Sequence, residues 1–187
     1  MDPLIPAFIA VMLAGLTDRP PVLVALLADR FGVSRTMAGA FVAHAVGYGI
    51  AAGAGALVAP QLPADARTLL LALALMAVGG STLFAARLRD RLDGWRLPGP
   101  IVAALGVGML ALGDRSQFLV FALSARTPAP ILAATGATLA ATAVAFVAAT
   151  LGERGWSRLP FTILRPIIGA LLLGTGAATA LTALRLA

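Results

Sequence analysis

Two adjacent charges in the middle of a long apolar stretch constrain this chain more than any other feature. Asp114 and Arg115 follow one another inside the apolar run 101–125. Insertion scales put the cost of one charged residue at the centre of a membrane-spanning helix at about 2.5–3.5 kcal/mol. The pair must therefore face protein or water rather than lipid, which makes it a candidate functional site.

The composition is that of an integral membrane protein. Of 187 residues, 60% are hydrophobic and 12% are charged, whereas an average soluble domain has roughly 25% charged residues. A membrane-spanning helix needs about 20 apolar residues. We predict an all-α, polytopic fold with a single transmembrane domain, residues 1–187, and six spans: 3–28, 36–60, 69–86, 101–125, 131–151 and 161–184. The first span is expected to be retained, because no basic segment precedes it as in a signal peptide.

The arginines are concentrated in alternate loops. Most of them fall in loops one, three and five of the predicted topology, which the positive-inside rule assigns to the cytoplasm. Both termini would then lie outside a bacterial inner (plasma) membrane. The net charge of +6 is scattered over short loops and does not indicate nucleic-acid binding.

The residues give no indication of an enzyme. There is no cysteine and one histidine, which excludes disulfides, thiolate metal sites and cysteine catalysis. Glu153 is the sole glutamate, and the metalloprotease, P-loop and similar motifs are missing. We expect no resident cofactor. The expected partners are the lipid bilayer and a small cation or small polar solute, and a homodimer is left open.

The chain reads as two copies of a three-span unit. Aligning Asp18 with Asp114 also aligns Arg19 with Arg115. With one further residue of offset, Gly39 aligns with Gly136, and Leu62 and Pro63 align with Leu159 and Pro160. Because three spans are an odd number, the second copy must enter the membrane from the opposite side. We therefore predict inverted repeats, residues 1–90 and 97–187, as in many secondary transporters.

The first span is predicted to break beside its charges. Pro20 and Pro21 have no N–H to donate, and they are best accommodated in the first turn of a restarted helix. Thr17 or Asp18 would then be the N-cap. In the second copy Gly113 is the weak point, and the available caps are Asp114 and Ser116.

The second predicted span is rich in glycine, and it contains the single histidine. Small residues allow close helix contacts in lipid, so spans two and five are expected to pack tightly against the broken spans one and four. His44 could relay protons, because its unperturbed pKa is near 6.5. The second copy has no matching residue, which favours a packing role with a hydrogen bond to a neighbour.

Residues 112–117, Leu-Gly-Asp-Arg-Ser-Gln, resemble a signature of the family of Golgi-type manganese/calcium–proton exchangers. That pattern is Glu-x-Gly-Asp-Lys/Arg-Ser/Thr, once in each half of a six-span, two-repeat protein. The first copy matches less well, with Thr17 in place of Gly and Pro20 in place of Ser or Thr. The resemblance implies a secondary transporter of manganese or calcium in exchange for protons, in which Asp18 and Asp114 would be metal ligands.

The signature glutamates are missing from both copies. Gly15 and Ala111 stand at their positions, so two carboxylates remain of the four that the family offers to a hard cation. If Arg19 and Arg115 both face the site, they already balance Asp18 and Asp114. A bound divalent ion would then leave uncompensated positive charge in the membrane. The cation site is therefore expected to be degenerate unless an arginine turns away.

Three hypotheses follow. The chain is a divergent cation–proton exchanger, whose ion pathway includes Thr17, Arg19, Arg115, Ser116 and Gln117 beside the two aspartates. Alternatively, the neutral Asp/Arg site carries another small polar solute. In the third hypothesis the chain is a non-transporting relative or subunit, held together by two cross-repeat salt bridges, one joining Asp18 to Arg115 and the other joining Asp114 to Arg19.

Overall fold

The computed structural model describes residues 2–84, 97–111 and 113–184, and every regular element in these residues is a helix. Two elements form a broken pair, α1 (Leu4–Gly15) and α2 (Arg19–Phe31), and a long helix follows, α3 (Val33–Val58). A 3-10 turn, η1 (Ala59–Gln61), leads into α4 (Ala64–Thr82). The order then recurs with the elements α5 (Gly99–Ala111), α6 (Arg115–Ser124), α7 (Pro130–Ser157) and α8 (Phe161–Ala183).

Several of these helices could cross a membrane. Within the described ranges, four are long and apolar enough, namely α3 with η1, α4, α7 and α8. A fifth span results if α1 and α2 count as one helix, bent by 69° at its break. The predicted span 101–125 is divided into α5 and α6, and α5 alone is a shorter apolar helix. The all-α class is confirmed for these residues, whereas the sixth span remains a prediction. The end of the predicted third span and the basic loop 87–96 lie outside the described residues.

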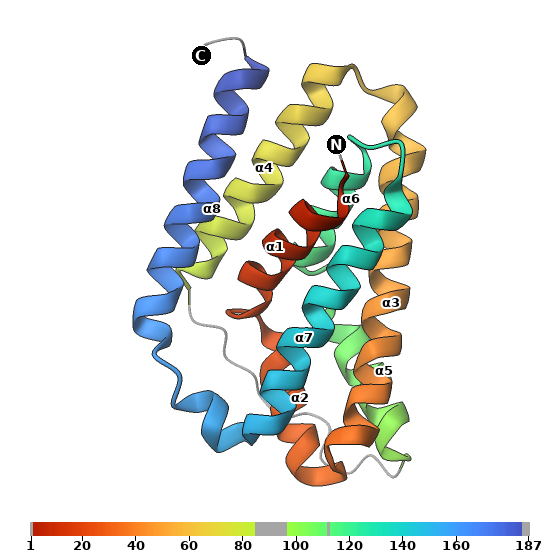
Figure 1. The fold of residues 1–187 in the computed structure, drawn as a ribbon, viewed down its shortest axis with the longest axis vertical. Helices are drawn as coiled ribbons and strands as arrows, with labels where there is room; N and C mark the ends of the chain where they lie inside the picture. Colours follow the sequence, from red (N-terminus) through yellow and green to blue (C-terminus); the bar gives the residue numbers. More distant parts are fainter. Residues whose placement is uncertain (1, 85–96, 112, 185–187) are drawn as a thin grey trace.

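The two broken pairs run in opposite directions. Figure 1 shows α1 and α2 descending from the end of the molecule near the N-terminus, and α5 and α6 ascending from the other end. The turns between α2 and α3 and between α7 and α8 share the lower end of the view, whereas the turns between α3 and α4 and between α6 and α7 lie at the upper end (Figure 1). Loops one and five of the predicted topology therefore lie at the same end of the bundle.

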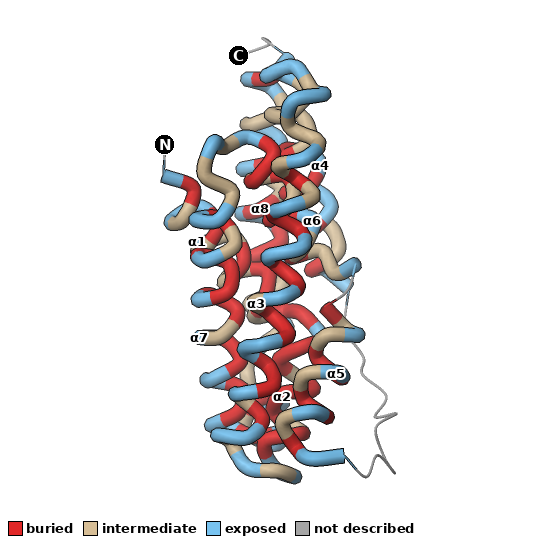
Figure 2. Tube along the Cα trace, turned by 90° about the vertical axis from the view of Figure 1, so that its right-hand side faces the viewer, coloured by how far each residue is buried: buried red, intermediate tan, exposed pale blue. Residues whose placement is uncertain are grey.

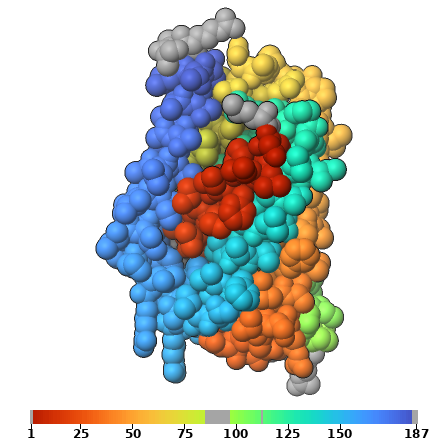
Figure 3. Space-filling view, in the orientation of Figure 1, coloured from red at the N-terminus to blue at the C-terminus, as the bar shows by residue number. Residues whose placement is uncertain are grey.

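Each long glycine-bearing helix packs against the broken pair of the other half. A Cβ atom added to Gly39 of α3 would lie 2.1 Å from the carbonyl oxygen of Pro100, at the start of α5. A Cβ atom added to Gly136 of α7 would lie 2.2 Å from the carbonyl oxygen of Leu4, at the start of α1. Figure 3 shows α1 lying across α7 on the face in view. The predicted close packing of the glycine-rich helices on the broken helices is therefore confirmed.

The core is built mainly from small and branched apolar side chains, while many large apolar side chains face outward. Figure 2 shows buried positions along one side of each central helix and exposed positions along the other. Leu57, Phe84 and Ile131 are 76%, 76% and 77% exposed. Large apolar side chains that point away from the core suit a surface in contact with lipid rather than water.

Candidate functional site

The two breaks have different local causes. In the first half, α1 ends at Gly15, and α2 restarts at Arg19 with prolines in its first turn, where their missing N–H groups leave no helical hydrogen bond unmade. In the second half, Gly113 has a φ of +76°, a conformation that side-chain-bearing residues rarely adopt. Both breaks lie where the sequence predicted them.

Each break places an aspartate at the N-cap position of the following helix. Asp18 precedes α2 and Asp114 precedes α6, both with extended backbones, but neither side chain makes a capping hydrogen bond. The Thr17 hydroxyl instead donates back to the carbonyl oxygen of Ala14 at 3.1 Å. The predicted N-cap positions of Asp18 and Asp114 are therefore confirmed, but neither side chain makes the capping hydrogen bond. The Asp18 carboxylate is engaged instead by groups from the other half of the chain.

Arg115 joins the two halves through its guanidinium. Its Nε and Nη2 atoms form an ion pair with Asp18, which is 4% exposed. Its Nη1 donates to the Ser81 hydroxyl on α4 at 2.8 Å, and its Nη2 donates to the Thr17 carbonyl oxygen at 3.2 Å. All three acceptors belong to the first half, so this side chain, the first residue of α6, fixes one break against the other.

The two aspartates meet at the same place. The carboxyl groups of Asp114 and Asp18 lie close enough for their charges to interact, and both side chains line one cavity. The Ser116 hydroxyl donates to Asp18 Oδ2 at 3.0 Å, and the buried Tyr48 of α3 lies near Ser116 and the two aspartates. Two carboxyl groups, one from each half of the chain, therefore face the same cavity.

The second predicted salt bridge does not form. Arg19 is exposed, and among the described residues no ion pair joins it to Asp114. The reason is its position at the start of α2, where it projects outward from the break. The site is therefore asymmetric, because one arginine is held between the halves and the other is not.

Gln117 closes the second break rather than facing the aspartates. Its Oε1 accepts from the backbone N–H of Gly113 at 3.2 Å. Its amide lies against Gly47 of α3, where a Cβ atom would come within 2.5 Å of Nε2. The side chain lines a separate apolar groove, with a volume of about 300 Å³, between α3 and α5.

A cavity of about 780 Å³ adjoins the paired charges. Both aspartates and both arginines line it, together with Ser81 and apolar side chains from α4, α5 and α6. Partly exposed charges in a cavity can be hydrated, which lowers the cost of holding them within a membrane. Polar side chains, charged side chains and an open cavity are therefore found together at this place.

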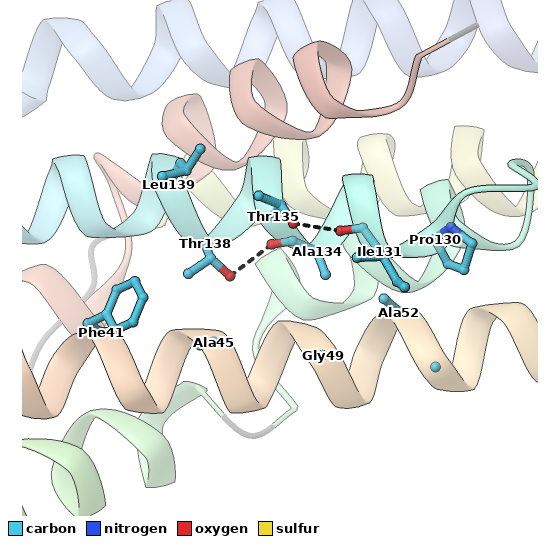
Figure 4. Close-up of a pocket in the computed structure, with 11 residues that line it drawn as sticks. Phe41, Ala45, Gly49, Ala52, Pro130, Ile131, Ala134, Thr135, Thr138 and Leu139 are labelled. Atoms are coloured by element: carbon cyan, nitrogen blue, oxygen red, sulfur yellow. Dashed lines mark hydrogen bonds between the residues drawn. The ribbon is translucent and has the colours of Figure 1, made fainter.

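A second groove, between α3 and α7, has a volume of about 460 Å³ and a different character. Figure 4 shows its wall of Gly49, Ala45, Ala52 and other apolar side chains. The hydroxyls of Thr135 and Thr138 donate to carbonyl oxygens of their own helix at 2.9 and 2.8 Å. This groove offers no charged ligand, so the candidate site is the cavity beside Asp18 and Asp114.

Two of the site's polar residues were not predicted from the sequence. Ser81 and Tyr48 come from the helices packed on the breaks, and neither belongs to the repeated Asp-Arg pattern. His44 is buried and stacks on the Tyr48 ring with a centroid separation of 5.9 Å. Its Nδ1 has no hydrogen-bond partner. The stacking agrees with the packing role favoured for His44 from the sequence, whereas Nδ1 does not make the hydrogen bond to a neighbour that was expected with it.

Comparison with known proteins identifies one family. The family model described as "Divalent cation/proton antiporter GDT1" matches residues 3–90 and again residues 100–186. Together the two matches cover nearly the whole chain, and each contains one break with its aspartate. No curated protein and no solved structure matches the chain.

Proposed function

We propose a transport function for this chain, which belongs to the divalent cation/proton antiporter GDT1 family: it exchanges a divalent cation for protons at the site formed by Asp18 and Asp114. Membership in this family of transporters agrees with the multi-pass membrane protein that the sequence predicted. One observation carries the proposal. Two carboxyl groups 96 positions apart in the sequence meet beside a cavity within the bundle.

Two neighbouring carboxyl groups support coupling to protons, because a carboxyl group can hold either a proton or a cation. If Asp18 is ionised against Arg115 and Asp114 carries a proton in the empty site, the three side chains carry no net charge. A divalent cation bound by both carboxylates would need that proton to leave for water in the cavity. The two ionised aspartates would then neutralise the cation, and the charge of Arg115 would remain uncompensated unless its side chain moved away from the carboxylates.

The ligand chemistry suits a hard cation. Carboxylate and carbonyl oxygens are the usual ligands of Ca²⁺, and they also suit Mn²⁺. We propose manganese or calcium as the transported ion. With Gly15 and Ala111 in place of the signature glutamates, the site has fewer anionic ligands than the family pattern provides, and we expect weaker cation binding as a result.

We further propose that the halves are inverted repeats that alternate access to this site. The double family match, the recurring order of elements and the opposite directions of the broken pairs support this proposal. The reciprocal packing of Gly39 on Pro100 and of Gly136 on Leu4 supports it as well. Broken helices whose ends meet within the bundle are a common setting for ion sites in such transporters.

Transport by the purified protein tests the proposal. In proteoliposomes with an imposed pH gradient, we expect Mn²⁺ or Ca²⁺ flux that Asp114→Asn abolishes. Asp2→Asn is the matched control, because Asp2 is exposed at the N-terminus. Absence of flux with Mn²⁺, Ca²⁺ and Mg²⁺ in the wild-type protein would rule the proposal out.

The ion pair between Asp18 and Arg115 favours a second candidate, a purely structural role. An ion pair that joins the two halves could hold a non-transporting fold together. Breaking a buried pair typically costs about 3–5 kcal/mol. This candidate predicts that Asp18→Asn lowers the melting temperature while the wild-type protein shows no flux.

A further inference from the structure

We propose that Arg115 is a tethered cation, which occupies part of the divalent-cation site when the site is empty and is displaced into the adjoining cavity when an ion binds. The inference rests on the proposed exchange function. It goes beyond it by assigning Arg115 a competitive role and by adding Ser81 to the ligands. The Arg115 guanidinium is then both the counter-charge of the empty site and the competitor of the transported ion.

The partners of the guanidinium are the first support. Three kinds of oxygen surround it: the Asp18 carboxylate, the Thr17 backbone carbonyl and the Ser81 hydroxyl. Each is an uncharged or anionic acceptor, and together they come from the first break and from α4. The same oxygens could coordinate a hard cation, so the arginine occupies a set of ligands suited to a metal ion.

The charge balance is the second support. A divalent ion held by Asp18 and Asp114 is neutralised by those two carboxylates alone. If Arg115 kept its present contacts, a cation would lie beside a cation at the buried Asp18 carboxylate, which is strongly unfavourable. Binding of the ion therefore requires the guanidinium to leave Asp18.

The cavity provides a place for the displaced side chain. Arg115 is 18% exposed and already lines this space of about 780 Å³. The first residue of a helix can turn its flexible side chain toward water while its backbone stays fixed. Arg19, the counterpart of Arg115 in the other half, is already exposed at the same cavity.

Cation binding to the detergent-solubilised protein tests the proposal directly. Removing the competitor should increase affinity, so we expect Arg115→Gln to lower the Kd for Mn²⁺ by about tenfold or more. Arg126→Gln is the matched control, because Arg126 is an exposed arginine just beyond the end of α6. It should leave the Kd at the wild-type value. In the Arg115→Gln background, Ser81→Ala should raise the Kd again.

The outcomes separate this inference from the function on which it rests. If wild-type protein binds and transports Mn²⁺ but Arg115→Gln binds it equally or more weakly, Arg115 is a supporting residue and the inference fails alone. If neither protein binds Mn²⁺ or Ca²⁺, both the inference and the proposed function fail.

A second measurement needs no substitution, and it therefore stands if Arg115→Gln does not fold. Phenylglyoxal modifies accessible arginine side chains, and mass spectrometry locates the product. We expect saturating Mn²⁺ to increase modification of Arg115 in the wild-type protein, with Arg126 as an internal control that does not change. Modification of Arg115 that stays constant or falls with Mn²⁺ would overturn the proposal.

Discussion

At the scale of single residues, the buried Asp18 carboxylate depends on donors that the other half of the chain supplies. Arg115 pairs with it, and the Ser116 hydroxyl donates to its Oδ2. Both donors lie in the first turn of α6, so that turn satisfies most of the hydrogen-bonding capacity of a side chain that is 4% exposed. Loss of either donor leaves a buried charge with fewer partners, which is costly.

We expect Ser116→Ala to destabilise the protein by about 1.5–3 kcal/mol, the usual range for a hydrogen bond to a charged group. The measurement is the free energy of unfolding in detergent. Ser157→Ala is the matched control, because the exposed Ser157 hydroxyl donates only to the Arg154 carbonyl of its own helix. Equal stability of the two variants would show that the bond to Asp18 contributes little.

At the scale of helices, glycine decides how closely α3 approaches α5. The carbonyl oxygen of Pro100 occupies the place where a Cβ atom of residue 39 would lie, whereas a Cβ atom on Gly49 meets nothing within 4 Å. The two glycines lie in the same helix. Comparing an alanine substitution at each position therefore distinguishes the effect of close packing from the intrinsic cost of glycine in a helix.

Gly39→Ala should therefore destabilise the protein by about 1–3 kcal/mol, because a backbone oxygen cannot move aside as a flexible side chain could. Gly49→Ala should be neutral or stabilising by up to about 1 kcal/mol, because alanine favours the helix. The free energy of unfolding, measured for both variants, checks whether the first substitution destabilises the protein and the second does not. A similar effect at the two positions would mean that the contact with Pro100 is not tight.

At the scale of the whole molecule, the proposed exchange predicts that cation binding and proton release are linked through the two aspartates. A site that holds one proton when empty and none when a cation is bound binds the cation more tightly as the pH rises. Loss of one proton corresponds to a tenfold change in affinity for about one pH unit. We expect the Kd for Mn²⁺ to fall about tenfold for each pH unit, over the pH range in which Asp114 keeps its proton in the empty site. A Kd that is independent of pH would contradict proton-coupled binding.

The orientation of the whole bundle is testable because the chain contains no cysteine. Ser34→Cys and Ser157→Cys place exposed thiols at the lower end of Figure 1, and Ala64→Cys places one at the upper end. From the positive-inside rule, we expect the first two to react with an impermeant maleimide only from the cytoplasmic side and the third only from outside. The reverse pattern would invert the proposed topology.

The sequence by itself was sufficient to predict the helical class, the breaks and the two-copy pattern. Each of these follows from local chemistry, because apolar length predicts a span, and Pro20 and Gly113 change the backbone where they stand. The family resemblance also depended on a short local motif, residues 112–117, and the family match agrees with it.

Only the tertiary structure decided which charges pair. Arg115 contacts Asp18 across 97 positions and Arg19 stays exposed, although the two arginines are equivalent in the sequence pattern. Ser81 and Tyr48 likewise enter the site from helices outside the motif. The direction of a side chain at a break depends on how each helix is rotated and packed against its neighbours. That rotation results from contacts between distant segments, such as Gly39 on Pro100, which no local pattern specifies.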